Sequence, residues 1–309
     1  MDGVLNFLKP PGITSHDAVA ICRRILKEKR IGHSGTLDPM AYGVLPIFLG
    51  KATRLIEYTE GFDKTYVAEG CFGSFTDTED SSGQLVLPDM NIGLANGVIL
   101  NQSSSDVSSL VHISTMDELA TVFETFLGEQ TQRPSKYSAI KINGIRAYEY
   151  ARKGIDVELP TRQVHIKSTE LLAYAFPYFT VRITCSSGTY IRSLLRDFFV
   201  KVGIPGTMTQ LCRSQVGQFL INEAYMAEEL MVHGENLVQP VDTALSFLSK
   251  VEVNDVQLIE MKQGKELAIT DAFSHTVVHQ LYRAYGPQGF IGIMRRTPQS
   301  MKVEKNIFI

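Results

Sequence analysis

Residues 32–39, with the sequence GHSGTLDP, leave the backbone few regular conformations. The segment holds two glycines, a histidine, two hydroxyl side chains, one carboxylate and a proline, a composition that does not suit a regular helix or strand. Glycine permits backbone angles that other residues avoid, and Pro39 restricts Asp38 to an extended backbone. We therefore expect a rigid loop that fixes the carboxylate of Asp38. An ordinary tight turn, with Asp38 bonded to its own backbone, fits this segment alone equally well.

The length and composition describe a soluble globular protein. The chain has 309 residues, enough for one large domain and a small one, and 44% of them are hydrophobic. No apolar run is long enough to span a bilayer, and the N-terminus does not resemble an export signal. The four cysteines lack a C-x-x-C spacing, so neither a disulfide framework nor a zinc site is indicated. We therefore expect a cytoplasmic protein without a membrane partner.

The net charge of −3 hides an uneven distribution of charged residues. Residues 65–129 contain ten acidic residues and no Lys or Arg, whereas residues 9–54 contain eight basic and three acidic residues. Residues 130–220 contain thirteen basic and five acidic residues. Two basic segments and an acidic one are compatible with an RNA-binding face. The alternative is that these charges are spread over the solvated surface.

Hydrophobic periodicity and capping signals indicate a mixture of strands and helices. A proline at position 46 predicts that its strand is an edge strand or contains a bulge. Thr14 or Ser15 is expected to cap the first helix, and Thr115 begins a capping box with Glu118. The predicted strands are 4–8, 44–49, 64–72 and 179–185, and the predicted helices are 15–29, 51–60, 116–128 and 189–202.

Two polar stretches follow the strand at 64–72. Asp77, Glu79 and Asp80 resemble the start of a calcium-binding loop, but the later Glu ligand and the required Gly are missing, so we reject that interpretation. Residues 89–114 are rich in Asn, Ser and Gly and are predicted to form a loose excursion.

Residues 132–153 interleave basic and aromatic side chains without a clear period. Aromatic rings stack on unpaired bases and cations contact phosphates, so this stretch is a candidate RNA-binding segment. A surface helix with Tyr148 and Ala151 packed inward is the other interpretation.

The segment from Phe179 to Val202 predicts a strand, a turn and a helix, with Tyr190 and Arg192 in the first helical turn. A cation in a first turn opposes the helix dipole. Arg192 is therefore expected to have a negatively charged partner, for which Asp38 is a candidate. A solvent-exposed Arg192 is the alternative.

The stretch 239–250 is a predicted boundary. Beyond it, strand-like runs at 276–279 and 290–294 and a helix at 256–262 indicate a small β-rich domain.

Seven motifs follow one another along the chain. They are Lys9-Pro10, residues 32–39, Lys64-Thr65-Tyr66, Tyr137-Ser138-Ala139, residues 148–154, residues 188–192 and Leu211. In order and approximate spacing they resemble those of the TruB-type tRNA pseudouridine synthases. The resemblance covers roughly residues 3–217 and implies an α+β pseudouridine synthase fold, in which helices and loops flank a long mixed β-sheet. It implies a catalytic domain at 1–245, with an RNA-binding insertion at about 130–160, and a PUA-like C-terminal domain at 246–309.

The same resemblance implies a reaction and a set of partners. The family converts the T-loop uridine U55 of tRNA into pseudouridine, so tRNA, through its T-arm, is the expected partner. No metal or cofactor is expected, and we expect a monomer.

The family resemblance also assigns roles to individual residues. Asp38 is the implied catalytic nucleophile or base, and Arg192 is expected to keep it ionised and oriented. Tyr66 is expected to stack on the uracil. The remaining assignments place Tyr190 and Leu211 in the pocket walls, His33 in the space left by the flipped base, and Lys9 against the Asp38 loop or a phosphate.

Three alternatives remain open from the sequence. The same chemistry could act on ribosomal RNA with a guide RNA, or the protein could bind or fold RNA without catalysis. An unrelated hydrolase could use Asp38, but it would need a metal cluster or a second paired carboxylate, and the sequence indicates neither.

Overall fold

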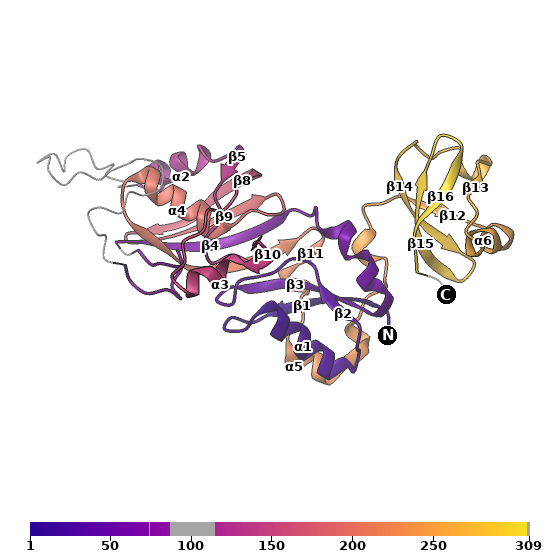
Figure 1. Cartoon of the computed structure of the whole chain (residues 1–309), viewed down its shortest axis with the longest axis horizontal. Helices are drawn as coiled ribbons and strands as arrows, with labels where there is room; N and C mark the ends of the chain where they lie inside the picture. Colours follow the sequence, from indigo (N-terminus) through magenta and orange to yellow (C-terminus); the bar gives the residue numbers. More distant parts are fainter. Residues whose placement is uncertain (74, 87–114, 308–309) are drawn as a thin grey trace, which may run out of the picture.

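The computed structural model describes residues 1–73, 75–86 and 115–307 of the chain (Figure 1). Within them a long nine-stranded sheet is followed by a five-stranded sheet at the C-terminal end of the chain. This is the α+β architecture that the sequence predicts. The predicted excursion at 89–114 lies outside the described residues. No helix in the described part of the chain has the length and apolar character needed to cross a membrane.

The large sheet is mixed, and its strand order brings distant segments together. Its strands follow the order β1-β3-β10-β4-β9-β8-β5, with β2 beside β3 and β11 beside β10. The β3–β10 pair is parallel, and the other pairs are antiparallel. The strands are β1 (Gly3–Lys9), β2 (Ile31–His33), β3 (Tyr42–Leu49), β4 (Lys64–Phe72), β5 (Gly128–Gln132), β8 (Arg162–Ala175), β9 (Tyr178–Cys185), β10 (Gly206–Val216) and β11 (Phe219–Leu220).

Helices pack on the sheet through two separate apolar clusters. One cluster joins α2 and α4 to the strands β4, β9 and β10, and the other joins α1 and α5 to β1 and β3. Of the two predicted caps of the first helix, Thr14 is the one observed, and the predicted capping box at Thr115 is present. The helical segments are α1 (Ser15–Leu26), the 3-10 segment η1 (Gly50–Thr59), α2 (Met116–Glu124), α4 (Ile191–Val202) and α5 (Ala227–His233).

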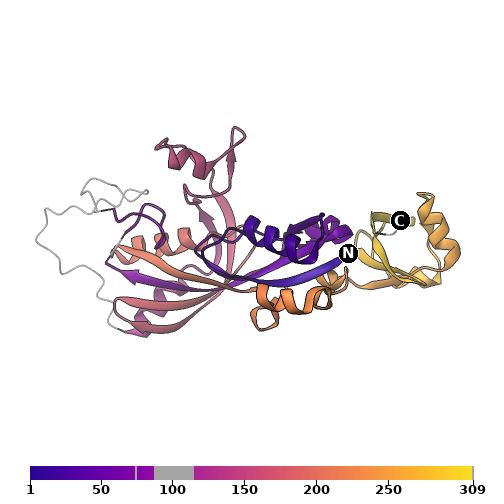
Figure 2. The same ribbon diagram turned by 90° about the horizontal axis from the view of Figure 1, so that it is seen from below.

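The chain between β5 and β8 forms a small projection. It contains the short strands β6 (Lys141–Ile142) and β7 (Ile145–Arg146) and the helix α3 (Ala147–Arg152). Figure 2 shows this hairpin and helix standing away from one face of the large sheet. The projection is the part of the chain in which the sequence interleaves basic and aromatic residues.

Three local predictions were wrong. Pro46 is not on an edge strand, because β3 lies between β1 and β10. The proline is tolerated because it lies between the part of β3 that pairs with β10 and the part that pairs with β2. Gly32 and His33 belong to β2, so the irregular loop begins only at Ser34. Residues 276–279 do not form a strand: 276 and 277 are irregular, and 278 and 279 form a turn.

Gly43 is a glycine that the fold requires. Its φ is +122°, and a Cβ there would lie 2.2 Å from the carbonyl oxygen of Arg213 on the neighbouring strand. We expect Gly43→Ala to lower the free energy of unfolding by about 3 kcal/mol or more, through backbone strain and a clash within the sheet. Urea denaturation measures this loss. Gly61→Ala is the matched control, since a Cβ at Gly61 meets nothing within 4 Å; equal stability of the two variants would contradict the prediction.

The C-terminal sheet has the order β12-β14-β15-β16-β13 and carries the helix α6 (Asp255–Lys262). An apolar cluster that includes Leu55, Leu245 and Ile293 joins it to the first part of the chain. The strands are β12 (Lys250–Glu252), β13 (Leu267–Ala268), β14 (Leu281–Gly286), β15 (Gly289–Arg296) and β16 (Ser300–Asn306).

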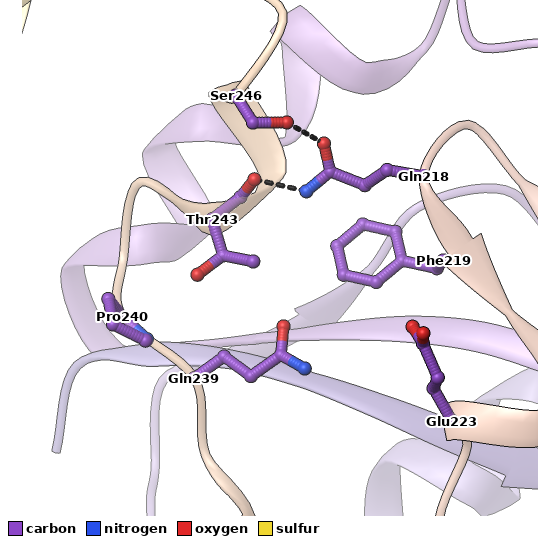
Figure 3. A pocket seen from close by; sticks show the side chains of 7 residues that line it. All are labelled: Gln218, Phe219, Glu223, Gln239, Pro240, Thr243 and Ser246. Atoms are coloured by element: carbon purple, nitrogen blue, oxygen red, sulfur yellow. Dashed lines mark hydrogen bonds between the residues drawn. The ribbon is translucent and has the colours of Figure 1, made fainter.

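The segment that leads into this sheet is fastened to the turn between β10 and β11. The side chain of Gln218 donates to the carbonyl of Thr243 and accepts from the hydroxyl of Ser246 (Figure 3). A cavity of 410 Å³ lies beside these bonds, lined also by Phe219 and Glu223. The connection is therefore held by specific polar contacts as well as by apolar packing.

Candidate active site

Asp38 and Arg192 form a bidentate ion pair. Nε of Arg192 lies 2.9 Å from Oδ2 of Asp38, and Nη2 lies 3.0 Å from Oδ1. The arginine side chain is 4% exposed, whereas the aspartate is 31% exposed. The predicted pairing of these residues, which are 154 positions apart, is thus confirmed. The arrangement buries the cation and leaves the carboxylate accessible.

Arg192 also contacts two further segments of the chain. Nη1 donates to the carbonyl of Thr78 at 3.2 Å, and Nη2 donates to that of Tyr137 at 3.2 Å. Burial alone would lower the pKa of Arg192, but the carboxylates of Asp38, Asp80 and Glu79 outweigh it and raise the pKa. The guanidinium is therefore charged at any physiological pH and fixed on several sides.

The acidic turn after β4 belongs to the site, which sequence reasoning missed. Oδ2 of Asp80 lies 3.5 Å from Nε of Arg192, and the Asp80 side chain is only 4% exposed. Oδ1 of Asp80 accepts from Thr78 Oγ1 at 2.8 Å and from the backbone N–H of Ser82 at 3.0 Å. Of the other two acids of this turn, Glu79 pairs with Arg196 and Asp77 accepts from the hydroxyl of Tyr137. The acidic residues themselves were the available sequence signal, because a buried cation such as Arg192 requires carboxylates to compensate its charge.

Two buried cations brace the loop that carries Asp38. Arg213, 1% exposed, donates to the carbonyls of Gly35, Thr36 and Val44 at 2.8 to 3.2 Å. Each nitrogen of its guanidinium thus holds backbone rather than facing solvent. Sequence reasoning missed this residue, because only the pairing of β10 with β3 brings it to the loop.

Lys9 is the second brace. Its Nζ donates to the carbonyls of Pro10, Ile13 and Ala41 at 2.7 to 2.8 Å and to that of Pro39 at 3.4 Å. Burial, and secondarily the charge of Arg213, lowers its pKa to about 8. Lys9 is fully buried and is not among the residues that line the cleft. Of its two predicted roles, bracing the loop matches these contacts.

A cleft of about 540 Å³ opens beside Asp38. Four of the predicted residues line it, namely Asp38, Tyr66, Tyr190 and Leu211. Tyr66 is 7% exposed, and burial raises the pKa of its phenol, so the hydroxyl is protonated. Leu211, on β10, is 4% exposed and presents an apolar surface. The cleft therefore places a carboxylate beside an aromatic ring and an aliphatic wall, a combination that accepts a flat, neutral ring.

Tyr190 is held by its backbone at the start of α4. The side-chain amide of Gln132 accepts from the Tyr190 N–H at 2.8 Å and donates to its carbonyl at 3.0 Å. Gln132 is 2% exposed and ends β5. This clamp fixes the position of the tyrosine at the wall of the cleft. Sequence reasoning missed Gln132, because it belongs to no recognisable motif.

His33 lies next to the loop but is not one of the residues that line the cleft. Its ring packs edge-on against that of His16, with 5.7 Å between the ring centroids. Burial, followed by the charges of His16 and Arg213, lowers the pKa of His33 to about 4. Nδ1 of this ring is buried and has no hydrogen-bond partner in the described part of the protein. The imidazole is therefore neutral at physiological pH.

The lowered pKa of His33 predicts how the free energy of unfolding depends on pH. The ordinary pKa of His33 is 6.5 and the folded value is about 4, so between these values the unfolded chain binds more protons. Stability should therefore fall as the pH is lowered from 6.5 to 4, with His33 contributing at most ~1.4 kcal/mol per pH unit. We expect His33→Gln to make the urea-derived free energy of unfolding less dependent on pH in this window. An identical pH profile for the variant would show that His33 is not the group responsible.

Comparison with solved structures identifies the fold. The structures entitled "Crystal Structure of a Cbf5-Nop10-Gar1 Complex" and "Structure of H/ACA RNP bound to a substrate RNA containing 2'-deoxyuridine" each contain a similar chain. Their TM-scores are 0.71 and 0.69 and their sequence identities 24% and 22%; each alignment covers 99% of this chain and 85% of the other. The fold is that of a pseudouridine synthase.

Sequence comparison defines the family. The model described as "TruB family pseudouridylate synthase (N terminal domain)" matches residues 23–96 and 97–191. The protein named tRNA pseudouridine synthase B of Caldanaerobacter subterraneus subsp. tengcongensis is 41% identical over 295 residues, which are 95% of this chain and 94% of that protein. The protein of the same name from Clostridium tetani is 35% identical over 308 residues, 99% of each chain. The chain belongs to the TruB family of pseudouridylate synthases, as its motifs predict.

Proposed function

We propose that this protein isomerises the T-loop uridine U55 of tRNA to pseudouridine, with Asp38 as the catalytic nucleophile or base. The observation that carries the proposal is the accessible Asp38 carboxylate, paired with buried Arg192 at the wall of a cleft. The family assignment supplies the reaction class, and the names of the full-length relatives favour tRNA as the substrate.

The reaction is an isomerisation in which no atoms are gained or lost. The N1–C1′ bond breaks, the uracil turns, and C5 bonds to C1′; the proton on C5 leaves and N1 gains one. The target base must first leave its stack, at a cost of roughly a few kcal/mol. An ionised carboxylate suits either attack on the nucleoside or removal of a sugar proton.

Each neighbour of Asp38 has a proposed role. Arg192 fixes the direction in which the carboxylate oxygens point, in a cleft from which the substrate displaces water. Tyr66 stacks on the uracil, and Tyr190 and Leu211 retain the free base while it turns. His33, neutral and next to the loop, occupies the space that the flipped base leaves in the RNA.

We also propose the domain roles that the family resemblance implies. Residues 1–245 form the catalytic domain, with the RNA-binding insertion at about 130–160, and residues 246–309 form a PUA-like domain. The ring of Tyr148 on α3 supports the insertion's role, since Arg152 lies 5.3 Å and Arg146 5.9 Å from its centroid. We propose that the protein acts as a monomer in the cytoplasm.

The test is incubation of the purified protein with an unmodified tRNA transcript, followed by mapping of pseudouridine. We expect one pseudouridine, at position 55, and the same product from an isolated T-arm. Product that forms only after a guide RNA is added would favour the guide-dependent alternative. RNA binding without any pseudouridine would favour the non-catalytic one.

Binding of tRNA should depend strongly on salt. The first basic segment presents Arg23, Arg24 and Lys27 as exposed side chains, and the insertion presents Arg152 and Lys153. If about six phosphates are neutralised, affinity should fall roughly 10³-fold between 50 and 200 mM salt. Filter binding over this range measures the slope, and the double variant Arg152→Gln/Lys153→Gln should lower it by about one to two. An affinity that does not change with salt would show that the basic segments do not contact the RNA phosphates.

A further inference from the structure

Arg162 differs from Arg192 and Arg213, the two arginines that hold the Asp38 loop. Arg192 and Arg213 each use all three guanidinium nitrogens to bond protein oxygens. Arg162 also lines the cleft, but among the described residues its one hydrogen bond goes from Nη1 to the carbonyl of Gly188 at 3.2 Å. Its Nε is buried without a partner in the same part of the chain. A guanidinium has five N–H donors, so most of those of Arg162 remain available.

The side chain is nevertheless held in a defined place. Arg162 is the first residue of β8 and pairs in register with Gln132, whose side chain clamps the backbone of Tyr190. The guanidinium carbon lies 5.1 Å from the centroid of the Tyr190 ring, a cation–π distance. Arg162 and the cleft wall therefore form one preorganised unit, which lowers the entropic cost of binding a ligand.

No carboxylate of the described residues neutralises the charge of Arg162 in an ion pair. Arg192 and Arg196 each form an ion pair with a carboxylate, whereas Arg162 forms none within the described residues. A half-buried guanidinium with spare donors favours an anion, and planar phosphate recognition is a common use of arginine. Uracil is neutral, so the anion that an RNA brings to this cleft is a phosphodiester.

These observations point to a contact with the RNA backbone. We propose that Arg162 binds the phosphodiester next to the flipped uridine, which holds the backbone at the cleft while the base enters it. This inference rests on the proposed function, since it concerns how the same site seats its RNA. Arg162 acts in binding and not in the chemical step.

A double-mutant cycle between protein and RNA tests the contact. The RNAs are T-arm stem-loops with a single uncharged methylphosphonate on the 5′ or the 3′ side of the target uridine. Each is compared with an all-phosphate RNA that carries the same 2′-deoxy sugar, which protects the modified linkage. We expect Arg162→Gln to weaken binding about tenfold and to lower the slope of log affinity against log salt by about 0.7 to 0.9. At one of the two linkages, the methylphosphonate should also weaken binding to the wild-type protein about tenfold. The same methylphosphonate should not weaken binding to Arg162→Gln any further.

Controls separate this contact from a general loss of structure or charge. Arg182→Gln removes an arginine that is paired with Glu170 and does not line the cleft, and it should leave affinity unchanged. Thermal unfolding checks that Arg162→Gln is folded; if it is not, Arg162→Lys goes through the same cycle and should keep part of the coupling. Additive losses at both linkages, or an unchanged affinity of a folded Arg162→Gln, would overturn the proposal.

The binding cycle and the enzymatic assay can fail separately. Suppose that Arg162 and one linkage are coupled in binding, but no pseudouridine forms in the all-phosphate transcript. That result would contradict the proposed function and leave the phosphate contact supported. Normal turnover without coupling between Arg162 and either linkage would overturn the phosphate contact and leave the proposed function standing.

Discussion

Asp38→Asn is expected to fold, to bind tRNA with nearly unchanged affinity, and to form no measurable pseudouridine. Asparagine has almost the same shape but no negative charge, so it can neither attack the nucleoside nor take a proton. We expect the single-turnover rate to fall by at least ~10⁴-fold, the size of effect typical when a residue of the reacting unit is removed. Quench-flow or manual sampling with a T-arm RNA, together with filter binding, measures both quantities.

The neighbours of Asp38 explain why the variant should remain folded. Removing one charge of a buried pair usually destabilises a protein, because the partner is left uncompensated. Here Asp80 remains 3.5 Å from Nε of Arg192, and the carbonyls of Thr78 and Tyr137 still accept from its guanidinium. Asp255→Asn, at an exposed carboxylate in the first turn of α6, is the control and should be fully active. Retained turnover in purified Asp38→Asn would exclude Asp38 as the catalytic group.

Arg192→Lys should be the second most damaging change, although it keeps the charge. A lysine presents one ammonium, which cannot match both carboxylate oxygens and also reach the carbonyls of Thr78 and Tyr137. Asp38 would lose its fixed orientation, so we expect the single-turnover rate to fall about 100-fold or more, with tRNA affinity changed less than tenfold.

Two comparisons sharpen this prediction. Arg192→Gln should be slower still, because it removes the cation and cannot hold both oxygens of the Asp38 carboxylate in place. Arg182→Lys, at an exposed ion pair that does not line the cleft, should behave as wild type. Near-normal rates for Arg192→Lys would mean that a positive charge alone supports catalysis and that the bidentate geometry is not required.

The residues that sequence reasoning found are those with a local signal. Asp38 stands out because glycines and a proline enclose it, and Arg192 because a cation in a first helical turn requires an anionic partner. The strand at 64–72 was predicted with the bounds that β4 has, and its residues alternate between buried and half-buried in the structure. In each case the evidence lies within about ten residues of the chain.

The residues that it missed depend on contacts made far along the chain. Arg213 reaches the Asp38 loop only because β10 pairs with β3, and Gln132 reaches Tyr190 only because β5 ends beside α4. Pro46 was misplaced for the same reason, because the sequence does not reveal which strand lies beside which part of β3. Local propensity describes the elements, whereas the strand order decides which side chains meet.

The ion pair between Asp38 and Arg192 has a consequence for synthesis on the ribosome. The two residues are 154 positions apart, and chains grow at roughly 5 to 20 residues per second, so the arginine emerges about 8 to 31 s after its partner. For that interval the nascent protein carries an aspartate without its cation. The pair can form only after β9 (Tyr178–Cys185) has been made, and the two strands of the large sheet that follow Arg192, β10 and β11, are still to come.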